Sequence, residues 1–234
     1  MMLSNGYQKG QFIFEHPFGS VYRIFKDEYN IHFEKCLIDG NISLDTFSTL
    51  HQLKHYSQIV EYETQKDYII IENINLLPPF LTSNEIKKLM IDMFYAIDIL
   101  KQHQLSIAHI SLNQIYQSNT HYKLDCYNIG NADYKTLIQD VCQIGLTIID
   151  EKESELYLLL KLFVNKKYQR SISSMIKQLE HVKVINEIYP INTNKKQDFR
   201  KNQYITSMLP KYLISYHLVK IVLIILFILI WFVF

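Results

Sequence analysis

Short apolar runs separated by polar breaks fill the first 75 residues of the chain. Five of these runs are rich in Ile, Val, Tyr and Phe and have the length of strands. Residues 44–56 differ, because Phe47, Leu50 and Leu53 recur there at helical spacing. The pattern therefore predicts five strands with one helix between the third and the fourth. The predicted strands are QFIFEH, SVYRIF, IHFEKCLI, QIVEYE and DYIIIENI.

After Pro79 the period of the apolar positions becomes that of helices. Residues 83–104 form an amphipathic pattern that begins at Ser83, a candidate N-cap. Short strand-like pieces follow over residues 105–127. The second part of the chain is thus predicted to be mainly helical. Further helices are predicted over residues 137–150, 155–164 and 171–182.

The most apolar segment is residues 213–234, and its last 14 residues contain no polar side chain. As a helix of ~1.5 Å rise per residue it would reach roughly 33 Å, about the thickness of a bilayer core. Because it has no polar face, a transmembrane tail anchor is favoured over a buried core helix. An excess of basic residues before the span predicts a cytosolic N-terminal domain. These residues are Lys195, Lys196, Arg200, Lys201 and Lys211.

Charge and cysteine content narrow the classes of function. The formal net charge is +1, which gives no support for a nucleic-acid partner. Three widely spaced cysteines, Cys36, Cys126 and Cys142, form neither a disulfide framework nor a CxxC metal site, so a reducing compartment is expected. The first ten residues contain no apolar run, which argues against a cleaved signal peptide.

Six segments stand in order along residues 10–182: FEHPFGSVYRI with Gly19, IHFEKCLI with Lys35, LHQLKHYSQIV with His55, LSIAHISL with His109, QDVCQIGLTII with Asp140, and NKKYQRSISSMI with Arg170. In this order they resemble the protein-kinase superfamily. The matching parts of that family are its glycine-rich loop, third strand, following helix, catalytic loop, large C-lobe helix and last helical turn. We therefore expect kinase-like ancestry.

The resemblance and the apolar C-terminus together imply the fold class. It is α+β: a two-lobed protein-kinase-like fold with a five-stranded N-lobe carrying one helix, a reduced helical C-lobe, and one C-terminal transmembrane helix. The expected domains are an N-lobe over residues 1–77 and a C-lobe over 78–189. A basic juxtamembrane linker over 190–212 and the transmembrane helix over 213–234 would follow.

The positions that would perform phosphoryl transfer in such a domain are altered. Ser111 stands in place of the base Asp, and a hydroxyl does not ionise near neutral pH. Cys126 stands in place of the metal-binding Asp. Phe14 and His16 replace two earlier glycines, and Phe33 replaces a small residue above the adenine, so all three should crowd the nucleotide site. The resemblance thus implies a pseudokinase without catalytic residues.

A residual nucleotide cleft is expected at Lys35, Gly19 and Glu72, with no metal site and no cofactor. ATP and Mg²⁺ would bind only if the domain were an active kinase. His109 is expected to hydrogen-bond the backbone within the core. Asp140 is expected at the start of a buried helix, where its carboxylate can accept backbone N–H groups of the loop above it.

These observations favour a membrane-tethered pseudokinase-like domain at the cytosolic membrane face, which acts by binding, scaffolding or allosteric regulation. Its expected partners are the membrane and another protein, such as a kinase or a membrane complex, and not nucleic acid. One alternative is a divergent active Ser/Thr-type kinase that uses Lys35 and Asp125. Another is the truncated remnant of a receptor-type kinase.

Overall fold

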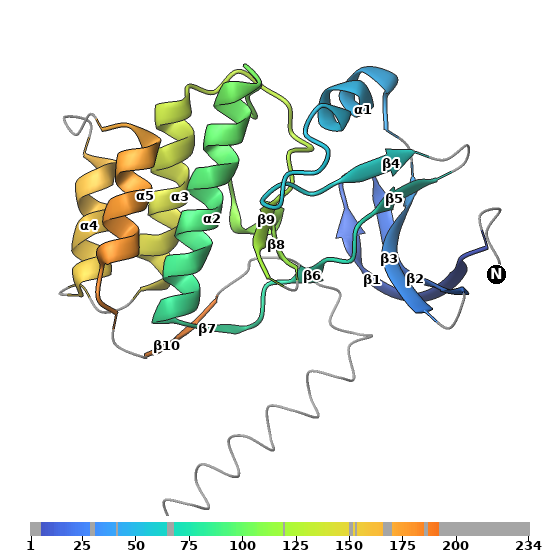
Figure 1. Cartoon of the computed structure of the whole chain (residues 1–234), viewed down its shortest axis with the longest axis horizontal. Coiled ribbons are helices and arrows are strands. Elements are labelled where there is room, and N and C mark those ends of the chain that lie inside the picture. Colours follow the sequence, from blue (N-terminus) through green and yellow to red (C-terminus); the bar gives the residue numbers. More distant parts are fainter. Residues whose placement is uncertain are drawn as a thin grey trace, which may run out of the picture. The chain divides into compact units, whose positions relative to one another are not determined.

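The computed structural model describes residues 6–28, 31–40, 42–64, 68–118, 120–149, 152, 154–165, 170–184 and 187–191. The chain divides into two compact units, residues 1–193 and residues 194–234, and all described residues belong to the first. Within that unit a five-stranded antiparallel sheet is followed along the chain by a group of helices, and the strands of two small sheets stand before, between and after these helices in sequence (Figure 1).

The large sheet has the strand order β1-β2-β3-β5-β4. Alternation along its strands divides the apolar side chains between two faces. Cys36 and Ile38 of β3 are buried in the main core, whereas Leu37 packs with Ile24 and Ile70 in a smaller cluster on the opposite face. The strands are β1 (Gln8–His16), β2 (Gly19–Glu28), β3 (Ile31–Gly40), β4 (Tyr62–Thr64) and β5 (Ile69–Ile71), and α1 (Leu44–His51) lies between β3 and β4 in sequence.

Four longer helices form the other part of the unit: α2 (Ser83–Gln102), α3 (Tyr134–Ile148), α4 (Glu155–Val164) and α5 (Ile172–His181). α2 packs against α3 and α5, and α3 packs against α4. The approach is closest at Gly145, where an added Cβ would collide with Leu160 and Met90. Because α2 presents a continuous buried stripe to these neighbours, it forms the centre of the helical core. The fully buried members of the stripe are Ile86, Leu89, Met90, Met93, Phe94, Ala96, Ile97 and Leu100.

Short strands connect the large sheet with the helices α2 to α5. A three-stranded sheet is made of β6 (Asn75–Leu76), β8 (Ile115–Gln117) and β9 (Tyr122–Leu124), and a two-stranded sheet pairs β7 (Phe80–Thr82) with β10 (Ile188–Pro190). The single-turn helix η1 (Leu112–Gln114) precedes β8. A bridge between Ile59 and Leu124 ties β9 to the segment that leads into β4. The end of β9 is thereby held next to the large sheet.

Most of the elements predicted from apolar periodicity are confirmed. Each of the five predicted strand segments overlaps one of β1 to β5, and α4 has the predicted bounds 155–164. The predicted N-cap of α2 was wrong by one residue. Thr82 is the cap, because its side chain accepts the N–H of Glu85 while the Glu85 carboxylate accepts the N–H of Thr82 at 2.7 Å. This reciprocal arrangement is a capping box.

The fold class predicted from the sequence, a two-lobed kinase-like domain with a transmembrane helix, was wrong as stated. The described residues form an α+β arrangement of antiparallel sheets and five α-helices. None of these described helices combines the length and the apolarity needed to cross a bilayer. The longest, α2, carries charged side chains at Glu85, Lys87, Lys88, Asp92, Asp98 and Lys101. The segment 213–234, to which the span was assigned, and the basic residues before it lie outside the described residues.

The capping box gives a test of how α2 is held. Thr82→Ala should lower the free energy of unfolding by about 1 kcal/mol, because it removes the acceptor for an N–H of the first helical turn. Urea denaturation of the full-length chain measures the change. The control is Ser48→Ala on the exposed side of α1, which we expect to stay within about 0.5 kcal/mol of the wild type. Equal effects of the two substitutions would contradict the capping role.

Candidate functional site

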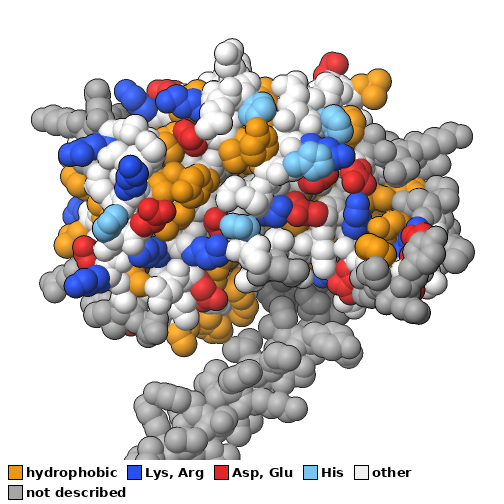
Figure 2. Space-filling view, viewed as in Figure 1, with side chains coloured by type: hydrophobic (Ala, Val, Ile, Leu, Met, Phe, Trp, Pro, Cys, Tyr) orange, Lys and Arg blue, Asp and Glu red, His pale blue; other side chains and the backbone are white. Residues whose placement is uncertain are grey.

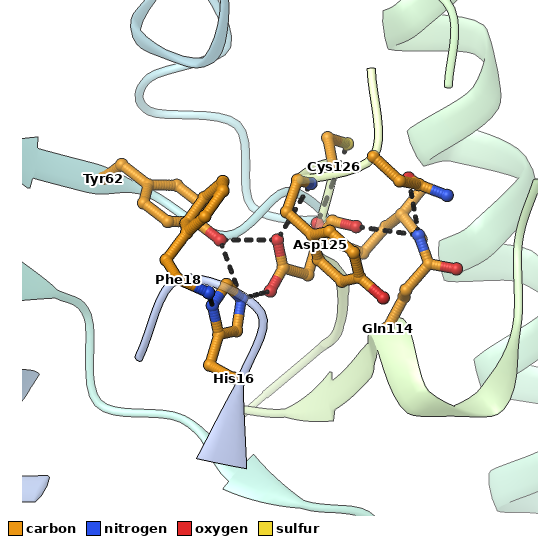
Figure 3. A network of polar contacts seen from close by, with 9 residues as sticks. His16, Phe18, Tyr62, Gln114, Asp125 and Cys126 are labelled. Carbon is orange, nitrogen blue, oxygen red and sulfur yellow. Dashed lines mark hydrogen bonds and ion pairs between the residues drawn. The ribbon is translucent and has the colours of Figure 1, made fainter. Parts of the chain in front are cut away.

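The side chain of Asp125, directly after β9, has no solvent-exposed surface. Its carboxylate is in contact with three hydrogen-bonding groups from separate segments (Figure 3). His16 Nε2 lies 2.8 Å from Oδ2, and the Tyr62 hydroxyl donates to Oδ1 at 2.5 Å. The backbone N–H of Tyr127 also donates to Oδ1, at 3.2 Å. A buried carboxylate needs such donors, because it has lost its hydration.

The tautomer of His16 follows from the other nitrogen of its ring. The backbone N–H of Phe18 donates to His16 Nδ1 at 3.1 Å, so Nδ1 carries the lone pair. The proton of a neutral imidazole then lies on Nε2, which donates to Asp125. One ring therefore accepts from the turn that follows it and donates to a carboxylate 109 residues further along the chain.

Tyr62 is suited to be a permanent donor. Burial raises the pKa of its hydroxyl well above the usual range, and the neighbouring Asp125 raises that pKa further. The phenol consequently keeps its proton at neutral and moderately alkaline pH. Its oxygen also lies 3.4 Å from His16 Nε2, so all three side chains form one connected network.

Aromatic rings enclose this network on the side of the large sheet. The Phe18 ring lies 6.2 Å from that of Tyr62 and 6.3 Å from that of Tyr127, measured between centroids. Phe14 stacks on Tyr116 at 5.2 Å. The turn between β1 and β2 thus places His16 and Phe18 in the space between the large sheet and the end of β9.

Two glycines permit this position of the turn. Gly19 has a φ of +142°, and an added Cβ would collide with the Asp39 carbonyl. A Cβ at Gly40 would overlap the Phe18 carbonyl. Gly19 is therefore required for backbone contact between β2 and the end of β3.

The predicted catalytic loop is held by an amide network instead of an acid. Gln114 accepts from the backbone N–H and the hydroxyl of Ser111, both at 3.0 Å, and its own amide donates to Asn128 at 2.7 Å. Asp140 accepts the backbone N–H of Ile110 at 2.9 Å. The predicted bracing role of Asp140 is confirmed, although Asp140 lies within α3 and not at its start.

The structure does not bring Lys35, Gly19 and Glu72 together. Lys35 pairs with Glu63 at 3.1 Å on the same face of the sheet as Ile24, opposite to the face that carries Cys36. Glu72 pairs with Lys123 at 2.6 Å. Strand alternation explains the position of Lys35, because its neighbour Cys36 occupies the inner face.

Other sequence-predicted residues have mixed outcomes. Phe14 and His16, which were expected to crowd a nucleotide site, are buried, but Phe33 is 42% exposed and fills no interior space. His109 is exposed, so its predicted place in the core was wrong. Cys126, which the resemblance puts in place of a metal-binding Asp, is fully buried.

The network of His16, Tyr62 and Asp125 was missed. The sequence suggested a role for Asp125 only in the active-kinase alternative, and in the structure Asp125 directly follows β9, which ends at Leu124. Within the described part of the chain, no group of three or more His, Cys, Asp or Glu residues could hold a metal ion. The arrangement around Asp125 can hold segments together, and its carboxylate has no solvent-exposed surface.

Neither a family model nor a curated protein matches this chain. The candidate function therefore depends on the geometry of the site alone.

The donor role of Tyr62 can be measured directly. Tyr62→Phe keeps the ring but removes one hydrogen bond to a buried charge, which should cost about 1.5–3 kcal/mol of unfolding free energy. Urea denaturation of the full-length chain checks this value. Tyr95→Phe is the matched control, since Tyr95 is 40% exposed on α2 and should change stability by less than about 0.5 kcal/mol. A change in the Tyr62 variant no larger than in the control would contradict the network.

The three thiols should be unreactive in the folded protein. Burial raises the pKa of Cys142 to about 12, and it also raises the pKa values of Cys36 and Cys126. The raised pKa keeps each thiol protonated at about pH 8, and only the thiolate reacts with iodoacetamide. Mass spectrometry should find no alkylation of these residues in the folded chain and three modified cysteines after unfolding in urea. Rapid labelling of any of them before unfolding would contradict their burial.

Proposed function

We propose that this chain is a degenerate, pseudokinase-like domain that transfers no phosphate and acts by binding a protein partner. The observation that carries the proposal is the state of Asp125. It directly precedes Cys126, the expected metal position, and it is fully buried among His16, Tyr62 and Tyr127. Mg²⁺ is bound through carboxylate oxygens that remain open to water and phosphate, which is not the condition of Asp125.

Two other residues expected in a phosphoryl-transfer site, Lys35 and Ser111, also make contacts with other partners. Such a site works by positioning the phosphates and neutralising their charge, for which it uses a lysine and metal ions. Lys35 is engaged by Glu63 on the opposite face of the sheet. Ser111 bonds to Gln114, so the loop offers an amide network where a general base would be needed.

A binding role is favoured because the contacts of His16, Tyr62 and Lys123 hold the large sheet and β9 in one arrangement. His16 and Tyr62 join the large sheet to the end of β9, and the Lys123–Glu72 pair joins β9 to the segment after β5. A domain held in this way can present a constant surface to a partner without a bound nucleotide.

The viewed surface supports a protein partner over a nucleic acid. In Figure 2 acidic and basic side chains interleave with apolar ones, and neither charge gathers into one large patch on that face. Nucleic-acid binding depends on a concentrated positive surface. The predicted membrane placement rests on residues 213–234, which lie outside the described residues, and it stays a prediction.

Nucleotide binding and transfer are the decisive measurements. The full-length chain, incubated with ATP and Mg²⁺, should show no rise in melting temperature and no phosphate transfer to itself or to a generic protein substrate. A ligand at 100 times its dissociation constant would add about 2.7 kcal/mol of stability, which a thermal scan detects readily. Partners recovered with the chain should be the same in ATP with Mg²⁺ and in EDTA.

Two variants make this test specific. Phosphate transfer that Asp125→Asn abolishes would overturn the proposal and favour the active-kinase alternative. Lys35→Met should abolish such transfer as well, because the active-kinase alternative uses both residues. Its partly exposed ion pair with Glu63 contributes at most about 1 kcal/mol of stability, so this loss would not come from unfolding. Partner recovery that depends on nucleotide would contradict a binding role that is independent of ATP.

A further inference from the structure

The turn between β1 and β2, residues 16–19, places a buried imidazole between the large sheet and the end of β9. The His16 side chain has no exposed surface, although the next residue, Pro17, is exposed. The ring of His16 is enclosed by Phe18 at 5.1 Å and by the edge of Tyr127 at 5.3 Å, measured between centroids. The ring that packs beside Asp125 thus comes from the first hairpin of the chain.

The same imidazole both shapes the turn and fastens it. Its Nδ1 accepts the N–H of Phe18 within the turn, and its Nε2 donates to Asp125 outside it. Tyr62 completes the attachment by donating to the other carboxylate oxygen (Figure 3). Loss of the imidazole would remove one donor from a buried charge and one acceptor from the turn together.

Behind the turn, the strand that carries it is irregular. The pairing of β1 with β2 shifts between Lys9 and Phe12 and again between Phe12 and Phe14. Such bulges interrupt the ladder and bend the strand. From Phe14 to His16 the pairing is regular again, so the tip of the hairpin is paired regularly beyond the irregular part of the strand.

We propose that His16, Asp125 and Tyr62 form a latch that holds the β1–β2 turn in place as an internal ligand, and that its release opens a site for a planar ring carrying an N–H donor. The inference rests on the proposed function, because a cleft used for ATP would need the turn elsewhere. The class of ligand follows from what the turn supplies now, which is one ring N–H to Asp125 between aromatic side chains. An imidazole or a similar heterocycle reproduces both features.

Hydrogen exchange on the full-length chain tests the latch. In the wild type, amides of residues 14–20 should exchange through a local opening, faster than the core amides of α2. His16→Ala should accelerate residues 14–20 by about tenfold or more, the cost of losing a hydrogen bond to a charged group, while α2 changes by less than about threefold. His109→Ala, at an exposed histidine, is the matched control and should change neither.

Added imidazole separates a latch from simple loss of packing. In His16→Ala, millimolar imidazole should restore the protection of residues 14–20, whereas 1-methylimidazole, which has no N–H donor when neutral, should not. Wild-type exchange of residues 14–20 only with global unfolding would overturn the proposal. Equal acceleration of α2 and residues 14–20, or rescue by both compounds, would overturn it as well. His16→Gln, which keeps one donor, provides the same measurement if the alanine variant does not fold.

The two proposals fail separately. Phosphate transfer by the wild type would remove the proposed function while leaving the exchange results intact. Unchanged exchange in His16→Ala together with absent transfer would remove only the latch.

Discussion

A carboxylate cut off from water must be given hydrogen-bond donors by the protein, and at Asp125 this requirement organises the centre of the domain. The donors come from the tip of the first hairpin, from strand β4 and from the backbone that follows β9. Removing any of them leaves a charge partly unsatisfied in a medium where that is costly. The large sheet and the end of β9 are thus joined by a buried polar contact.

The same contact bears on the proposed absence of phosphoryl transfer. A phosphate-binding loop must leave room between the hairpin and the end of β9, and here His16 and Phe18 use that room. The cation of Lys35 stabilises the outer face, through Glu63. Lys123 supplies positive charge nearer the junction, but it is paired with Glu72 at 2.6 Å. Lys35, Lys123 and Asp125 thus all take part in contacts that hold the structure.

Much of the fold was accessible from the sequence because apolar periodicity is a local signal. The runs around Val21 and Ile38 and the stripe of α2 predicted their elements, since burial of one face produces the pattern directly. The site was not accessible in the same way. Whether Asp125 points inward depends on where β9 ends, and β9 ends at Leu124, directly before Asp125. The contact between His16 and Asp125 joins residues 109 positions apart in the sequence. The exposed positions of Phe33 and His109 likewise follow from three-dimensional packing, which residue type does not reveal.

Gly19, at the start of β2, and Gly40, at the end of β3, limit how far the β1–β2 turn can move. Gly19 and Gly40 meet backbone to backbone, with carbonyl groups where side chains would otherwise begin. The position of the His16 imidazole therefore depends on the lack of a side chain at Gly19 and at Gly40, which lie on neighbouring strands. A methyl group at either position would collide with a backbone carbonyl and push the turn away from β3. The shift would exceed the few tenths of an ångström over which a hydrogen bond keeps its geometry.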